Sequence, residues 1–137
     1  LIDDLLDLTA IASGKVVLKL GPVDMHGLVN AVADMLADPI AQAGQKLVLE
    51  LAATQATVMA DAARMQQVLW NLMRNAVKFS PRGATITVRT ASNRTGFRLE
   101  CIDEGIGIEP EALPRIFNAF EQADREVTRL YGGLGLG

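Results

Sequence analysis

The sequence predicts an α/β sandwich in which helices cover one face of a mixed β-sheet. An amphipathic pattern at helical spacing runs over residues 66–79, and a second one runs over residues 24–43. Alternating apolar residues, typical of half-buried strands, follow over residues 84–90 and 97–103. Helices gathered on one side of such a sheet bury the apolar faces of both kinds of element.

The helix predicted over residues 66–79 organises the rest of the chain. At about 100° per residue, its apolar stripe consists of Met65, Val68, Leu69, Leu72, Ala76 and Phe79. An adjoining polar arc consists of Arg64, Gln67, Asn71, Asn75 and Lys78. Amide oxygens suit Mg²⁺, a hard cation that prefers oxygen ligands, and a lysine one turn further on suits a phosphate. A solvated helix face explains the same residues, so the helix alone leaves both interpretations open.

Composition fits one folded domain and argues against several function classes. Half of the 137 residues are apolar, which suits a packed core. The net charge of −3 and the scattered basic residues argue against nucleic acid as a partner. No apolar run reaches the length of a membrane span, and no signal peptide is visible. The single Cys101 excludes an internal disulfide and predicts a reduced core thiol. We therefore expect a cytoplasmic location, which is compatible with membrane segments elsewhere in a parent protein.

The first sixty residues predict two helices and three strands. A helix end is expected over residues 1–13, because leucines share one line and Gly14 follows. A strand is expected over Val16–Leu20, with a break at Gly21 and Pro22. Asp24 is the expected N-cap of a helix to about Ala43, which Pro39 kinks or interrupts and Gly44 ends. Two further strands are expected over residues 47–51 and 57–60.

Asp61 is the expected N-cap of the organising helix, which Phe79 ends. The two strands that follow predict a hairpin, joined by a loop over residues 91–96. Phe97, Leu99 and Cys101 define the inward face of the second strand, and Asp103 has the same parity. An inward-facing carboxylate requires hydrogen-bond donors. The alternative is a strand-end aspartate that closes a turn.

Four motifs together make a specific pattern. They are the helix over residues 66–79, DEGIGI over residues 103–108, IFNAF over residues 116–120 and GGLGLG over residues 132–137. In this order and at these intervals, they resemble the catalytic, ATP-binding domain of sensor histidine kinases. That domain belongs to the GHKL superfamily, with type II topoisomerases and a heat-shock chaperone class. The resemblance covers nearly every residue, and implies a Bergerat-type fold and the cofactors ATP and Mg²⁺.

The resemblance also implies roles for individual residues. Asn75 would bind Mg²⁺, Lys78 would bind phosphate, and Phe79 would lie against the adenine. Asp103 would accept a hydrogen bond from the adenine amine, and glycines beside it would let the backbone approach the base. The implied ATP-binding set is Asn71, Asn75, Lys78, Phe79, Asp103, Gly105, Gly107, Ile108, Phe117, Gly133, Leu134, Gly135, Leu136 and Gly137.

The C-terminal motifs resemble a nucleotide lid and a phosphate cradle. Phe117 and Phe120 resemble the phenylalanine box that anchors the lid, although both residues also suit a hydrophobic core. The segment of residues 121–131 suits either a lid or an ordinary loop. Its candidates for contact with the terminal phosphates are Gln122, Thr128 and Arg129. Backbone amides in GGLGLG can cradle phosphate oxygens. The family often has Thr where this chain has Leu134, which removes one hydroxyl group.

Asn71 predicts phosphoryl transfer rather than hydrolysis. ATPases of the superfamily place a glutamate at this position, where it activates water. An amide cannot act as a general base at neutral pH. Water attack should therefore be slow, which leaves the γ-phosphoryl group for a better-placed nucleophile. Positioning and charge neutralisation would then supply most of the catalysis.

The resemblance implies two domains and a nucleophile outside the chain. Residues 1–14 resemble the end of the second helix of a dimerisation hairpin, and residues 15–137 resemble the ATP-binding domain, ending inside the second glycine box. His26 is expected to be a bystander, so the acceptor histidine is expected on the hairpin. The expected partners are that hairpin, a response-regulator receiver domain and a second copy of the parent protein. The alternatives are a nucleotide-binding pseudokinase, a GHKL ATPase and an anti-sigma serine kinase. The fragment alone is expected to be marginally stable and not to phosphorylate itself.

Overall fold

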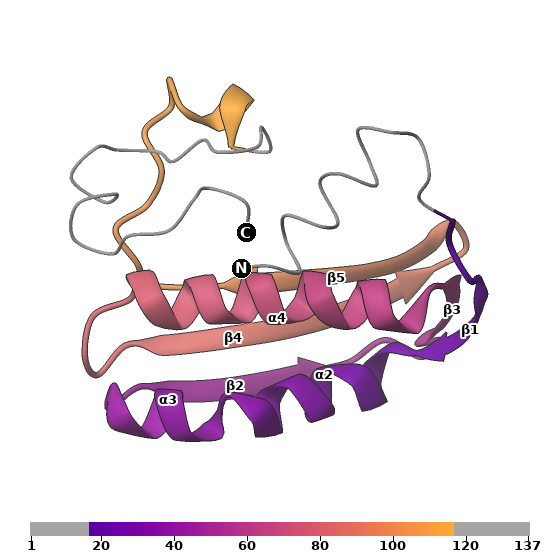
Figure 1. Ribbon diagram of the computed structural model, residues 1–137, viewed down its shortest axis with the longest axis horizontal. Helices are drawn as coiled ribbons and strands as arrows, with labels where there is room; N and C mark the ends of the chain where they lie inside the picture. The colour runs from indigo at the N-terminus through magenta and orange to yellow at the C-terminus, as the bar shows by residue number, and fades with distance from the viewer. Residues whose placement is uncertain (1–16, 117–137) are drawn as a thin grey trace. The chain divides into compact units, whose positions relative to one another are not determined.

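The computed structural model describes residues 17–116, and the chain divides into two compact parts. The larger part, Lys19–Ile106, holds all the strands and α-helices of the described residues (Figure 1). They are β1 (Gly21–Asp24), α2 (Met25–Met35), α3 (Ala37–Gln42), β2 (Lys46–Leu51), β3 (Thr57–Ala60), α4 (Ala62–Phe79), β4 (Thr85–Asn93) and β5 (Gly96–Ile102). Residues 107–116 belong to the other part and contain a short 3₁₀ helix, η1 (Leu113–Arg115). The helix predicted over residues 1–13 lies outside the described residues.

The strands of the larger part form two sheets. One sheet has the order β2-β4-β5, with β2 parallel and β5 antiparallel to β4. Val88 in the middle of β4 lies opposite Leu49 of β2 and Cys101 of β5. The second sheet pairs β1 with β3 in antiparallel fashion. The mixed sheet with helices packed on it confirms the predicted fold class.

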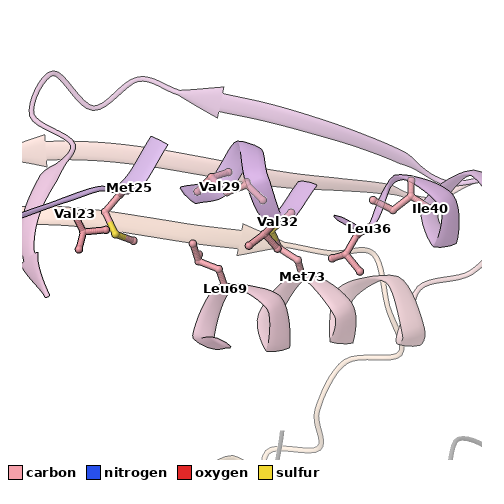
Figure 2. Packing of buried hydrophobic residues seen from close by; sticks show 9 residues of the cluster. Val23, Met25, Val29, Val32, Leu36, Ile40, Leu69 and Met73 are labelled. Atoms are coloured by element: carbon pink, nitrogen blue, oxygen red, sulfur yellow. The ribbon is translucent and has the colours of Figure 1, made fainter. Parts of the chain in front are cut away.

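One hydrophobic core joins the helices to the sheet. Helices α2 and α4 lie side by side over the strands (Figure 1), and their apolar residues meet in one cluster (Figure 2). Buried residues of both helices and Val88 of β4 contribute to this cluster. Its members are Val23, Met25, Val29, Val32, Leu36, Ile40, Leu69, Met73 and Val88.

The rotation of α4 about its axis differs from the sequence prediction. Its buried residues are Leu69, Met73 and Ala76, at spacings of four and three. Val68 and Leu72, which the predicted stripe included, are 46% and 45% exposed, whereas Met73 is 1% exposed. The predicted stripe did not include Met73. Met73 is buried instead, and its flexible thioether side chain is well suited to fill irregular space in a core.

The first predicted strand is displaced along the chain. Residues 17–20 are irregular, and the strand is β1, which includes the two residues predicted to form a break. Pro22 is tolerated there because β1 pairs on one side only, with β3, and an edge strand can leave one backbone donor unused. The strands predicted over residues 47–51 and 57–60 are confirmed as β2 and β3.

The predicted interruption by Pro39 is confirmed, and it divides the helix into α2 and α3. The break falls at Leu36, directly after Met35. A proline clashes with the carbonyl group four residues before it, and for Pro39 that residue is Met35. Asp24 is the N-cap residue of α2, as predicted, but its side chain makes no capping hydrogen bond. Gly44 follows the C-cap of α3 with a φ of 62°, which favours glycine.

The hairpin of β4 and β5 is longer than predicted. Its connection is only Arg94 and Thr95, rather than the six residues expected. The Asn93 side-chain oxygen accepts hydrogen bonds from the backbone N–H groups of Thr95 and Gly96, at 2.8 and 3.1 Å. An asparagine that binds its own backbone in this way closes a tight turn.

Substitution in α4 tests the observed rotation of the helix. Met73→Ala should lower the free energy of unfolding by about 2–5 kcal/mol, because it leaves a cavity in the core. Leu72→Ala, on the exposed side of the same turn, should lower it by a fraction of that value. Urea unfolding followed through the fluorescence of Trp70 measures both. Equal losses, or a larger loss for Leu72→Ala, would contradict the rotation described.

A pH titration tests the N-cap of α4. The Asp61 carboxylate accepts hydrogen bonds from the backbone N–H groups of Lys19, Arg64 and Ala63, at 3.0, 3.3 and 3.1 Å. These bonds, that from Lys19 foremost, lower the pKa of Asp61 from its ordinary value of 3.8. A lowered pKa contributes stability that is complete above the unfolded pKa and is lost as pH falls through the folded pKa.

Asp61→Asn should flatten the acid side of the stability profile. Asparagine caps a helix about as well as aspartate, so the bonds from Ala63 and Arg64 to Oδ1 are retained. The substitution removes the negative charge and the Oδ2 acceptor of the Lys19 N–H group. The unfolding midpoint of the variant should lie below that of the wild type at pH 7, and the two should converge below pH 3.8. Thermal melts at stepped pH measure the difference. If the unfolding midpoints of the wild type and the variant differed by the same amount at every pH, the charge of Asp61 would not contribute to the pH dependence of stability.

Candidate functional site

One face of α4 presents two amides that have no hydrogen-bond partner among the described residues. Asn71 and Asn75 are half-buried, and within residues 17–116 their side chains make no hydrogen bond. Each amide therefore keeps an oxygen acceptor and two N–H donors for a ligand or for water. These two residues of the predicted polar arc are therefore partly sheltered from solvent, and their predicted ligand contacts stay predictions.

Apolar side chains flank these amides. Val68 and Leu72 are exposed, and with Asn71 and Asn75 they recur at the spacing i, i+3, i+4 and i+7, which places all four on one helix face. A surface that alternates apolar and amide groups suits a flat ring with polar edges. The sequence prediction assigned both apolar residues to the core and so missed them as candidate lining residues. Their spacing relative to the two asparagines was the signal that could have identified them.

Lys78 and Phe79 form the last turn of α4 and contact each other. The Lys78 ammonium group lies 5.4 Å from the centre of the Phe79 ring, a cation–π contact. Lys78 also borders a cavity of about 310 Å³ on the side of α4 that faces α2 and α3. The other lining residues are Met35, Leu36, Pro39, Trp70, Arg74 and Val77. The ammonium group of Lys78 is therefore held near the helix end by a weak contact.

Asp103 does not point into the core, and that prediction is wrong. Strand β5 ends at Ile102, so the alternation that placed the carboxylate inward stops one residue before it. Asp103 is exposed, and its Oδ1 accepts a hydrogen bond from the N–H group of Gly105 at 2.8 Å. Within residues 17–116, Oδ2 takes no hydrogen bond. One oxygen closes a turn, as the alternative interpretation held, and the other is available as an acceptor.

Gly105 brings this turn against the end of α4. A Cβ atom at Gly105 would lie 2.8 Å from the Phe79 carbonyl oxygen and 2.9 Å from Asp103 Oδ1, which is too close for any other residue. The neighbouring Ile106 N–H donates to the same Phe79 oxygen at 3.3 Å. The turn that carries Asp103 and the helix that carries Asn75 are therefore joined directly.

Several predicted site residues cannot be placed beside these. Gly107 has a φ of 75°, and Ile108 is exposed, but both belong to the other compact part of the chain. Phe117 and Phe120, the candidates Gln122, Thr128 and Arg129, and the glycine box with Gly133, Leu134, Gly135, Leu136 and Gly137 lie outside the described residues. Their predicted roles stay predictions.

Two further reactive side chains, Cys101 and His26, are partly buried. Cys101 is half-buried, and burial, together with the nearby charge of Asp103, raises the pKa of its thiol to about 11. The thiol is therefore protonated at neutral pH. His26 is half-buried, with Nε2 2.8 Å from the Thr90 hydroxyl oxygen.

The described residues contain neither a metal cluster nor a membrane-spanning helix. Among them, no three of His, Cys, Asp and Glu gather where they could hold a metal ion. Nor does the described part of the chain contain a helix of the length and apolarity that a bilayer crossing requires.

The fold is an α/β sandwich whose longest described helix, α4, carries two amides without hydrogen-bond partners among residues 17–116. Residues 60–137, more than half of the chain, match the family described as histidine kinase-, DNA gyrase B- and HSP90-like ATPase. The chain belongs to this family, as the sequence motifs predicted.

Individual relatives are histidine kinases. The chain is 33% identical over 142 residues to the signal transduction histidine-protein kinase BarA of Escherichia coli K12, with all of this chain and 16% of BarA covered. The structure of full-length ShkA in complex with AMPPNP matches with a TM-score of 0.83 at 30% identity, over 98% of this chain and 27% of ShkA. ThkA, solved in complex with the response regulator TrrA, matches with a TM-score of 0.73 at 22% identity, over 88% of this chain and 37% of ThkA. This last match shows a shared fold.

Gly105→Ala tests the close approach of the Asp103 turn to α4. The added methyl group meets a backbone oxygen that cannot move away cheaply, so the free energy of unfolding should fall by about 1–3 kcal/mol. Gly21→Ala is the matched control, because a Cβ atom there meets nothing within 4 Å. Its effect should stay within about 0.5 kcal/mol. Urea unfolding of both variants measures the difference, and equal effects would refute the close approach.

Proposed function

We propose that this chain is the ATP-binding core of a two-component sensor histidine kinase. In this proposal it binds Mg²⁺ and ATP and transfers the γ-phosphoryl group to a histidine on a dimerisation hairpin, from which a response regulator receives it. The observation that carries the proposal is the arrangement at α4. Asn71 and Asn75 have no partner in residues 17–116, and Gly105 joins their helix to a turn with an open carboxylate oxygen.

The base would bind at the Asp103 turn. Asp103 Oδ2 would accept a hydrogen bond from the adenine amine, while Oδ1 stays on the Gly105 N–H group. Leu72 and Phe79 would offer apolar surface to the ring. The absence of a side chain at Gly105 keeps the turn close to the helix, and so keeps the acceptor near that surface.

The phosphates would bind along the helix. The free oxygen of Asn75 fits a hard cation, which prefers neutral or anionic oxygen ligands. When bound, Mg²⁺ would neutralise negative charge on the phosphate oxygens. Lys78 would leave the Phe79 ring to reach a phosphate, and this exchange costs little because a cation–π contact at a surface contributes about 0.5–1 kcal/mol. Gly133, Leu134, Gly135, Leu136 and Gly137 would complete the cradle, and the segment that starts at Phe117 would close over the nucleotide.

Asn71 favours transfer over hydrolysis. Its amide can orient a ligand through a hydrogen bond, but it cannot remove a proton from water at neutral pH. The acceptor would therefore be a histidine outside residues 15–137, on the hairpin whose last turns residues 1–14 would form. The proposed setting is cytoplasmic, in a homodimeric parent protein. The ThkA–TrrA complex supports a response regulator as the partner that receives the phosphoryl group.

A transfer assay tests the proposed reaction. The protein at its natural length is incubated with γ-labelled ATP, Mg²⁺ and the histidine-bearing hairpin. Acid-labile, base-stable label on the hairpin is the expected result, because phosphohistidine has those properties. Tight nucleotide binding without label would support a pseudokinase, and release of labelled phosphate without label on the hairpin would support an ATPase. Either outcome would overturn phosphoryl transfer.

Substitutions at the site test nucleotide binding. Asn75→Ala and Asp103→Ala should each weaken binding of Mg²⁺·ATP by about 10- to 100-fold, which corresponds to the loss of one strong hydrogen bond or metal ligand. Without Mg²⁺, Asn75→Ala should weaken nucleotide binding far less, because the wild-type protein then also lacks the contact between Asn75 and the metal ion. Asn30→Ala, an exposed asparagine of α2, is the matched control. Titration calorimetry measures each dissociation constant, and an unchanged constant for Asp103→Ala would remove Asp103 from the base site.

A further inference from the structure

The C-terminal end of α4 is closed by a side chain from another segment. The last carbonyl groups of a helix have no partners within the helix. Here the chain leaves α4 in an extended conformation, with Ser80 at φ −95° and ψ 145°, so no glycine cap forms. The Gln45 side chain supplies the missing donors. Its Nε2 donates to the carbonyl oxygens of Val77 and Ser80, each at 3.0 Å.

Gln45 itself is fixed by its backbone. It lies between α3 and β2, and its N–H group donates to the Ile40 carbonyl oxygen at 3.1 Å. On either side of it, the Gly44 carbonyl accepts from the Gly83 N–H at 3.1 Å, and the Lys46 N–H donates to the Ala84 carbonyl at 2.9 Å. The loop is therefore bonded both to α3 and to the turn that follows α4, and it holds the amide at a set distance from the helix end.

The bonds of Gln45 also have a local cost. Its Oε1 and the Ser80 hydroxyl oxygen are buried, and within the described residues neither has a hydrogen-bond partner. A buried polar atom without a partner destabilises a protein, because it loses its hydrogen bonds to water and gains none in return. Rotating the amide by 180° would place Oε1 against two carbonyl oxygens, so the observed orientation is the only favourable one. The arrangement is imperfect for stability, yet it fixes two carbonyl groups, three residues apart, at the end of α4. This combination points to a role in the geometry of the helix end.

We infer that Gln45 is a positioning residue for the nucleotide site. This inference rests on the proposed function, because the residues that Gln45 orients are the proposed ligands. Lys78 and Phe79 lie between the two carbonyl groups that Gln45 binds. The Phe79 carbonyl group accepts from Ile106 in the Asp103 turn. The last turn of α4 is thus held by Gln45 from one segment and by the Asp103 turn from another, which sets the distance between the base acceptor and the helix.

Gln45→Met tests this inference. Methionine has the length of glutamine and suits a half-buried position, but it cannot donate a hydrogen bond. The last turn of α4 should then fray. Backbone amides of residues 77–79 should exchange with deuterium faster than in the wild type, and the dissociation constant for Mg²⁺·AMPPNP should rise about tenfold. Both are measured on the protein at its natural length, well below its unfolding temperature. A purely structural residue would shift the unfolding temperature without changing affinity in the folded state.

Arg82→Ala is the matched control. Arg82 Nη1 donates to the Gln42 carbonyl oxygen at 3.2 Å, so it links the same two segments without contact to the carbonyls of α4. This variant should keep the wild-type dissociation constant and the wild-type exchange at residues 77–79. If Gln45→Met does not fold, Gln45→His retains one N–H donor and should show a smaller loss of affinity in the same assay.

The outcomes separate this inference from the proposed function. Unchanged affinity in Gln45→Met, while the wild type binds nucleotide, overturns the positioning role alone. An equal loss in Arg82→Ala also overturns it, because any loosening of the two segments would then suffice. A wild-type protein that does not bind nucleotide overturns the proposed function, and the positioning role with it.

Discussion

The burial of one stripe of α4 against the sheet is the constraint on which the rest of the site depends. Leu69 and Met73 belong to the same core as Val32 of α2 and Val88 of β4, and this fixes the rotation of the helix about its axis. A helix has about 100° between successive residues, so a shift of the buried stripe by one residue would turn Asn75 away from its present direction. The polar face is therefore positioned by contacts that contain no polar atom.

The end of α4 is fixed by a second, independent set of contacts. Hydrophobic burial sets the rotation of the helix, but it constrains position along the axis only loosely because apolar contacts are not directional. Hydrogen bonds are directional. Those from Gln45 and Ile106 to the last carbonyl groups of α4 set where the helix ends, and the contact of Gly105 with Phe79 sets how close the Asp103 turn can lie. Rotation and axial position are thus determined by different kinds of interaction.

The sequence predicted most elements because their signals are local. The N-cap Asp61, the proline that interrupts the second helix and the alternation in β4 each act within a few residues. The errors fall where tertiary contacts decide. Nothing local shows that Met73 is buried and Leu72 exposed, or that Pro22 is acceptable because its strand pairs on one side only. The prediction for Asp103 failed because the alternation of a strand has no meaning beyond the strand end. The bonds of Gln45 join segments more than thirty residues apart, and no pattern in the sequence indicates them.

The contacts described divide the proposed site into a fixed end and an adjustable end. Asp103, Gly105 and Phe79 are held by backbone hydrogen bonds and close packing, so the surface proposed for the base exists before any ligand arrives. Lys78 is held by one cation–π contact with Phe79, which is weak enough to exchange for a phosphate. Binding energy is lost whenever a group must be ordered on association. In the proposed site, a rigid surface for the base and one adjustable cation would place that cost at the end where the phosphates would bind.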